Sequence, residues 1–365
     1  MQTMTMRERM LAVYRNQLPD RIPVAIYQRY LPRGSVEREI RNLGLGIIDY
    51  FPVVSFLAPP WHFYPGFISE VKGAELTVKY IWDRDKLIER RSYETPVGVI
   101  YQDVSQYIGA GSEHISKYYI SCLEDYKVMQ YLVENTVFRK NEAAIRLKIT
   151  DLGADGVVLG RVDRCPYQKL LIELAGAQQF LMDLYTDPEP ILALMDAMDR
   201  KMDEAFALVL ESDAAVIWQP DNVTSDMTPP DSFRKYCLPF YQKHAKQTQA
   251  AGKPYIVHMD GRVKALKDLI NEANFNGIES LSFPEIGGDL TLTEARAAFP
   301  GKVIIPNFPA NLCSQTAPEI AAYLENLLLE AGDGVPFMLQ VSEDIPVDQW
   351  QRVLSVLCQV IHKKS

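Results

Sequence analysis

The chain has 365 residues, of which 47% are hydrophobic and 23% charged, a composition typical of a globular protein with a large core. Its formal net charge is −9 and it contains no block of Lys or Arg, so we expect no nucleic-acid partner. No stretch reaches the roughly 18 continuous apolar residues that span a bilayer, and the amino terminus reads as an amphipathic helix rather than a signal peptide. We therefore expect a cytoplasmic protein with no membrane partner.

Short apolar runs that read as strands occur eight times, and from residue 150 onward they alternate with longer helical patterns. The predicted strands are Ile22–Tyr27, Ile48–Phe56, Gly153–Gly160, Ala214–Trp218, Pro254–His258, Gly277–Phe283, Val303–Asn307 and Phe337–Val341. The helices predicted between and after them are Asp187–Glu211, Pro230–Ala251, Val263–Asn274, Leu292–Ala298, Pro318–Ala331 and Val347–His362. Strand-then-helix alternation predicts a parallel sheet with helices outside.

Eight strands favour closure into a single (β/α)8 TIM barrel that spans residues 1–365 as one domain, preceded by an N-terminal helix. A doubly wound sheet is the alternative, but no GxGxxG motif follows the first strand to hold a dinucleotide. Between the second and third strands the pattern changes to short antiparallel strands, followed by helical stretches. We expect a β-rich insertion at about residues 70–120, with strands Glu75–Trp82, Lys86–Tyr93 and Val97–Asp103 and helices Leu123–Asn135 and Val137–Leu152.

Polar residues just past the strand ends are the candidates for chemistry, because the loops of a parallel barrel converge there. The sequence places the following residues at these positions: Arg161, Asp163, Arg164, Gln219, Asp221, Asn222, His258, Asp260, Glu285, Asn307, Ser342, Glu343 and Asp344. The set is rich in carboxylates.

The segment His258–Gly261 is the sharpest local feature, because residues two apart in an extended chain point to the same side. An imidazole beside a carboxylate suits zinc, for which Glu343 is the expected third ligand, with Ser342, Asp221 or Cys313 as alternatives. A second interpretation makes His258 and Asp260 a general acid/base pair. A third is purely structural, with His258 bonded to the next strand and Asp260 capping the following helix.

Other residues suggest substrate contacts. Arg29 beside Tyr27 follows the first strand and could dock an anionic group, although a solvated loop is the alternative. Trp61 lies in an aromatic loop that could shield a flat ligand from water. The remaining expected substrate contacts are Asn222, Arg161 and Asn307, and the expected catalytic residues are His258, Asp260, Asp221 and Glu343.

The chain resembles the uroporphyrinogen decarboxylase superfamily, which also includes zinc methyltransferases that serve corrinoid proteins. The resemblance rests on the order of several stretches between residues 94 and 346: Glu94–Gly98, Leu123–Tyr126, Asp221–Asn222 before Pro229–Phe233, Leu238–Tyr241, Gly252–Pro254 before His258–Gly261, Gly288–Leu292 with Glu294–Arg296, and Ile345–Pro346 after the last strand. The fold that it implies is the (β/α)8 barrel.

The resemblance departs from the haem-pathway decarboxylase. Ala25 stands where that enzyme has an arginine, Ile172 where it has a tyrosine, and Ser342 where it has a histidine. In the corrinoid-linked methyltransferases zinc is held by a His-x-Cys pair and a last-strand Cys. The matching positions here carry His258, Asp260, and Ser342 beside Glu343. Oxygen ligands favour a Lewis acid for an ether oxygen, so the resemblance implies an O-demethylase type of methyltransferase.

The implied function is methyl transfer between a small methoxylated substrate, preferably an aryl methyl ether, and a corrinoid. The cobalamin-binding signature Asp-x-His-x-x-Gly is absent, so the cobalamin is expected on a separate corrinoid protein. Zinc is the expected metal, and a homodimer remains open. The rival hypotheses are a metal-free decarboxylase of another acidic substrate, a methyl-tetrahydrofolate-dependent methyltransferase, and a binding protein without activity.

Overall fold

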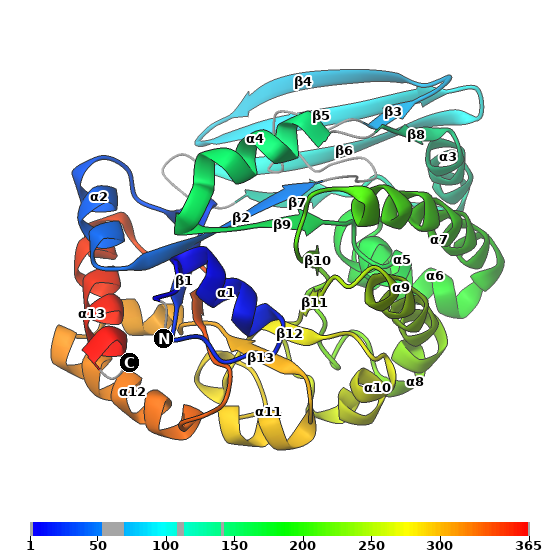
Figure 1. Ribbon diagram of the computed structural model, residues 1–365. Coiled ribbons are helices and arrows are strands. Elements are labelled where there is room, and N and C mark those ends of the chain that lie inside the picture. The colour runs from blue at the N-terminus through cyan, green and yellow to red at the C-terminus, as the bar shows by residue number, and fades with distance from the viewer. Residues whose placement is uncertain (1–2, 53–68, 108–112, 140–141, 364–365) are drawn as a thin grey trace. The chain divides into compact units, whose positions relative to one another are not determined.

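A computed structural model of the chain describes residues 3–52, 69–107, 113–139 and 142–363 (Figure 1). The chain divides into two compact units. We call them the barrel unit, formed by residues 1–51, 143–161 and 213–365, and the sheet unit, formed by residues 52–142 and 162–212. That the whole chain acts as one domain stays a prediction.

Eight parallel strands form the barrel unit's sheet, in the order β13-β12-β11-β10-β9-β2-β1-β14. A bridge between Asn307 and Gln340, with the Phe308 amide donating to the Gln340 carbonyl at 2.7 Å, joins the two end strands. The predicted (β/α)8 barrel is therefore confirmed. The strands are β1 (Val24–Tyr27), β2 (Leu45–Pro52), β9 (Gly156–Arg161), β10 (Ile217–Gln219), β11 (Tyr255–His258), β12 (Gly277–Leu281), β13 (Val303–Pro306) and β14 (Leu339–Val341).

Helices of the barrel unit surround these strands (Figure 1). Neighbouring helices pack in sequence, α9 against α10, α11 against α12, α12 against α13, and α13 against α2. Capping boxes such as Thr291 with Glu294 satisfy amide groups at helix starts. The helices are α1 (Met6–Tyr14), α2 (Ser35–Asn42), α4 (Glu142–Leu152), α8 (Pro230–Ser232), α9 (Leu238–Ala250), α10 (Lys267–Glu272), α11 (Leu292–Ala298), α12 (Ala317–Ala331) and α13 (Trp350–Lys363).

The predicted N-terminal helix is confirmed as α1, which packs against β9. Gly46 near the start of β2 lets α1 approach this strand closely, since a Cβ atom at position 46 would lie 2.9 Å from the Met6 side chain. Tyr14 ends this helix and is fully buried.

The sheet unit contains the predicted β-rich insertion. Its four-stranded antiparallel sheet has the order β4-β5-β6-β7, and a two-stranded sheet pairs β3 with β8. The strands are β3 (Ser69–Val71), β4 (Glu75–Asp83), β5 (Lys86–Thr95), β6 (Gly98–Tyr107), β7 (Glu113–Lys117) and β8 (Thr136–Phe138), and the helices are α3 (Leu123–Glu134), α5 (Pro166–Lys169), α6 (Ala177–Thr186) and α7 (Pro188–Glu211).

Three expectations about elements need correction. The helix predicted over Val137–Leu152 begins only at Glu142, because residues 136–138 pair with β3. The sixth barrel strand ends at Leu281, two residues before Phe283. The second barrel strand begins at Leu45, and the last residues predicted for it lie outside the described ranges. Within those ranges no helix has the length and apolar character needed to cross a membrane.

Candidate active site in the barrel

A buried carboxylate, Glu279, is the centre of a polar cluster inside the barrel. His258 and Glu279 are partners in the register of β11 and β12, so their side chains share one face of the sheet. The His258 Nδ1 atom lies 2.7 Å from Glu279 Oε2, the Tyr27 hydroxyl donates to Glu279 Oε1 at 2.5 Å, and the Trp218 indole donates to Oε2 at 2.9 Å. The Gln340 amide donates to Oε1 as well. Each carboxylate oxygen therefore has two polar partners.

These contacts determine the charge states of His258 and Glu279. Burial alone lowers the pKa of His258, but the negative charge of Glu279 and contacts with Asp260 outweigh it and raise that pKa to about 10. Burial raises the pKa of Glu279, whereas the His258 charge and the surrounding hydrogen bonds bring it below its ordinary value. The pair is therefore an imidazolium beside a carboxylate at neutral pH.

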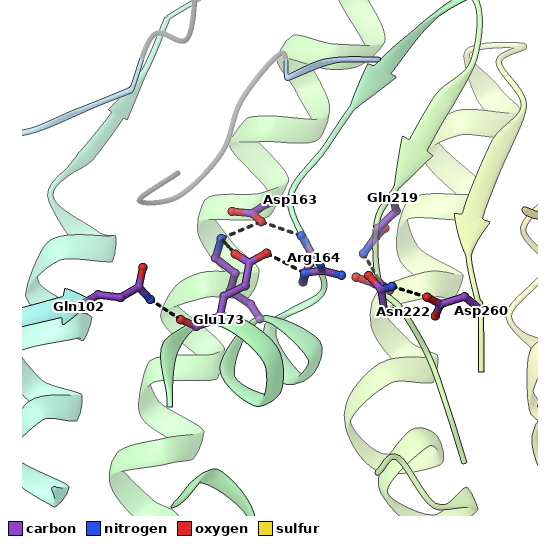
Figure 2. Close-up of polar contacts among 9 residues, drawn as sticks. Gln102, Asp163, Arg164, Glu173, Gln219, Asn222 and Asp260 are labelled. Atoms are coloured by element: carbon purple, nitrogen blue, oxygen red, sulfur yellow. Dashed lines mark hydrogen bonds and ion pairs between the residues drawn. The ribbon is translucent and has the colours of Figure 1, made fainter. Parts of the chain in front are cut away.

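The structure also brings together the two residues that the sequence singled out. His258 Nε2 lies 3.5 Å from Asp260 Oδ2, and Asp260 is about a quarter exposed while His258 is buried. The Asn222 amide donates to Asp260 Oδ2 at 2.6 Å (Figure 2), and the Asn222 backbone donates to the His258 carbonyl at 3.0 Å. Asn222 has φ 52°, a left-handed conformation that asparagine tolerates better than most residues. The imidazole is thus held between two carboxylates.

Glu343 follows β14 and is half-buried. Burial raises its pKa, and it interacts electrostatically with His258, Asp260 and Glu279, so it lies near the same cluster. Two ligand atoms of one tetrahedral zinc are about 3.3 Å apart, close to the separation of His258 Nε2 and Asp260 Oδ2. However, no group of three His, Cys, Asp or Glu side chains within the described ranges is arranged to hold a metal ion. The described residues therefore do not form a complete zinc site.

Aromatic rings line the cluster. Tyr50 lies edge-on to Tyr27, with ring centroids 5.5 Å apart, and is 5.0 Å from Trp218. The Arg161 guanidinium lies 5.7 Å from the Tyr50 ring centroid and 5.9 Å from that of Trp218. All four side chains are buried, so they form an apolar aromatic wall with one cation against it.

The other predicted substrate contacts are placed as follows. Arg29 is exposed, lies over the Tyr30 ring at 4.8 Å, and opposes the rise that burial causes in the pKa of Asp344. Asn307 is buried, its Oδ1 accepts from the Ser342 amide at 3.0 Å, and its Nδ2 has no partner among the described residues. Trp61 lies outside the described residues.

Asp221 belongs to a different hydrogen-bond network. It is fully buried, and its Oδ2 accepts from the Tyr241 hydroxyl of α9 at 2.5 Å and from the Gln219 amide at 2.9 Å. The Tyr255 hydroxyl donates in turn to Gln219. These contacts tie the loop after β10 to α9.

We expect Tyr241→Phe to lower the free energy of unfolding by about 1–3 kcal/mol, because a buried carboxylate loses a donor. Urea unfolding measures the change. Tyr185→Phe is the matched control, since Tyr185 is 86% exposed, and it should leave stability unchanged. Equal stability of the two variants would show that Asp221 does not depend on the Tyr241 hydroxyl.

Sequence reasoning missed Glu279, Gln340 and Trp218. The candidate residues were those just past the strand ends, whereas these three lie within β12, β14 and β10. A signal was present, because Glu279 interrupts an apolar run that reads as a buried strand. A charged residue in that position requires a partner inside the barrel.

A second cluster of charges lies in the sheet unit. Lys169 is fully buried, and its Nζ lies 3.0 Å from Asp163 Oδ1 and 2.5 Å from Glu173 Oε2. The Arg164 Nε donates to Glu173 Oε1 at 2.8 Å, and the Gln102 amide donates to the Glu173 carbonyl at 2.8 Å (Figure 2). A π-helical turn over Leu170–Leu174 carries Glu173. The sequence singled out Asp163 and Arg164 but not Lys169 or Glu173.

Comparison with known proteins gives a family and a fold. The family model described as uroporphyrinogen decarboxylase (URO-D) matches residues 169–364. A methyltransferase from Methanosarcina mazei has a similar structure, with a TM-score of 0.58 and 14% identity, over 99% of this chain and 100% of that chain. D-Psicose 3-epimerase from Clostridium cellulolyticum H10 has a TM-score of 0.37 and 11% identity, over 59% of this chain and 83% of that chain. No curated protein sequence matches the chain.

Proposed function

Because the chain belongs to the uroporphyrinogen decarboxylase family, we propose that it transfers a methyl group between a small methoxylated substrate and the corrinoid of a separate protein. An aryl methyl ether is the proposed substrate. The structural similarity to a protein described as a methyltransferase, which covers both chains almost completely, supports this choice within the family.

One observation carries the proposal: the carboxylates of the site offset its cations. Asp260 and Glu279 flank the His258 imidazolium, and Glu343 lies nearby. A substrate with several carboxylates needs net positive charge to bind. The site offers little net positive charge, which favours a neutral substrate such as an ether over an acidic one.

The chemistry that this site could perform is protonation of a leaving oxygen. In demethylation the bond between the methyl carbon and oxygen breaks, and its electron pair stays on oxygen. Reduced corrinoid, the co-substrate, supplies the nucleophile for the methyl carbon. His258 Nδ1 faces Glu279, and its Nε2, which lies 3.5 Å from Asp260 Oδ2, can donate a proton to that oxygen while Asp260 orients the ring. Glu279 balances the charge of the imidazolium before the transfer.

We assign substrate positioning to the aromatic wall beside the cluster. The rings of Tyr27, Tyr50 and Trp218 offer apolar faces and edges for an aryl group, and Arg161 lies against the last two rings. The Asn307 Nδ2, which has no partner among the described residues, could donate to a polar substituent of the ring.

The test is methyl transfer from a methoxyphenol to free cob(I)alamin, followed by its change in absorbance. We expect the purified protein to accelerate the transfer and His258→Ala to lower the rate by about 100-fold or more, because it removes the proton donor. His114→Ala is the matched control, since His114 is an exposed residue of β7.

Two outcomes would contradict the proposal. One is an unchanged rate in His258→Ala, and the other is corrinoid-independent release of CO2 from an acidic substrate. Zinc held by His258, Asp260 and Glu343 stays a prediction and is an alternative to proton donation by His258, because an Nε2 that binds zinc carries no proton. The same proteins test it. Stoichiometric zinc that is lost in His258→Ala supports it, whereas full activity of a zinc-free protein counts against it.

A further inference from the structure

We propose that Ser280 is a positioning residue, which holds a bulge in β12 so that the Glu279 carboxylate faces His258. The inference deepens the proposed function, because it concerns the same site. It stands on backbone geometry and on a pair of buried hydroxyl groups, and it does not depend on which reaction the site performs.

The bulge is visible in the register of β12 and β13. Glu279 pairs with Ile305 and Leu281 pairs with Pro306, so Ser280 is an extra residue without a partner in β13. Its φ is 62°, in the left-handed region that normally requires glycine. A strained backbone of this kind persists only where its surroundings hold it in place.

The bulge changes which way two consecutive side chains point. In a regular strand neighbouring residues face opposite sides of the sheet. Here Glu279 receives a hydrogen bond from Gln340, while the Ser280 Oγ lies 2.5 Å from the Ser342 Oγ. Gln340 and Ser342 are two residues apart in the same stretch of chain and share one face. Both Glu279 and Ser280 therefore point into the barrel.

The hydroxyl pair fixes this arrangement. Ser280 is completely buried and Ser342 is 4% exposed, so water does not compete for their hydrogen bond. Ser342 is itself held, because its amide donates to Asn307 Oδ1 at 3.0 Å. Serine therefore supplies at position 280 what glycine could not, a side chain that ties the bulge to β14.

The proposed consequence is that loss of either hydroxyl releases the bulge and withdraws the Glu279 carboxylate from the imidazole. Ser280→Gly suits the left-handed backbone and removes the side chain that carries the hydroxyl. Ser342→Ala removes the other hydroxyl and leaves the bulge residue intact. Two variants on different strands keep the test valid if one of them fails to fold.

The experiment uses the full chain with 15N-labelled histidine and no substrate. The His258 Nδ1 proton, bonded to Glu279, should give a far-downfield NMR signal in the wild type. We expect Ser280→Gly and Ser342→Ala to lose this signal or shift it upfield. Ser282→Ala should keep it, since Ser282 is a buried serine just beyond the same strand and lies outside the hydrogen bond between Ser280 and Ser342.

An unchanged signal in a folded Ser280→Gly or Ser342→Ala protein would overturn the proposal. The signal is read without methyl transfer, so the positioning role and the proposed function fail or hold separately. In the transfer assay the same variants should lower kcat at least 10-fold with KM unchanged. A purely structural role would instead reduce the amount of folded protein and leave the remaining kcat intact.

Discussion

We expect Lys169→Met to lower the free energy of unfolding by about 3–5 kcal/mol, because it leaves two buried carboxylates without their shared cation. Lys169 is fully buried, and Asp163 and Glu173 are 1% and 3% exposed. Arg164 donates to Glu173 through its Nε and to Asp163 through its backbone amide. Methionine matches the length of the lysine stem, so the lost charge, rather than a cavity, causes the change.

Urea unfolding of the full chain measures this effect. The matched control is Lys201→Met in α7, where Lys201 pairs with Glu204 at 3.0 Å and the Glu204 side chain is 56% exposed. Solvent screens such a pair, so the control should change stability by about 0–1 kcal/mol. If both variants lower the free energy of unfolding by the same small amount, the stability of the buried cluster does not depend on Lys169.

The second large effect is expected for Glu279→Gln, which keeps the shape of the side chain and removes its charge. Removal of one partner from a buried ion pair costs about 3–5 kcal/mol at pH 7. The other partner, His258, then has burial opposed by its contacts with Asp260, so its pKa falls below about 10. His258 should therefore lose its proton at a lower pH in this variant than in the wild type.

The pH dependence of stability has a definite sign. The pKa of His258 is about 10 in the folded protein and about 6.5 in an unfolded chain, so the stabilisation is complete below pH 6.5 and is lost as the pH rises through 10. Between pH 7 and 9 this one group lowers the stability of the wild type by about 1.4 kcal/mol per pH unit. Glu279→Gln should show a flatter dependence.

Unfolding curves at pH 7, 8 and 9 test this prediction. Glu285→Gln is the matched control, because Glu285 is an exposed acid a few residues beyond β12. It should keep the wild-type slope. Parallel slopes for the wild type and Glu279→Gln would mean that Glu279 does not hold the charge on His258.

The barrel was predictable from the sequence because its strands are buried on both faces. Runs such as Pro254–His258 are continuously apolar and alternate with helical patterns, which is the signature of a parallel sheet. The helix predicted from Val137 failed because pairing with β3 overrides the local pattern at residues 136–138. Such pairing joins segments distant in sequence, and periodicity within one segment does not contain it.

The site was predictable only in part. His258 and Asp260 are two residues apart, so local geometry was enough to place them side by side. Glu279 was missed because it lies within β12, whereas the candidates were taken from residues past the strand ends. Asp221 contacts Tyr241 on a helix that follows it, a tertiary contact that the loop sequence does not reveal.

The indole of Trp218 has a practical consequence. It is 4% exposed, donates to Glu279 and lies with its ring centroid 5.9 Å from that of His258. Its fluorescence therefore reports directly on the charge and hydrogen bonding beside the imidazole. The barrel carries its own optical probe, with which candidate small molecules can be screened by titration without turnover.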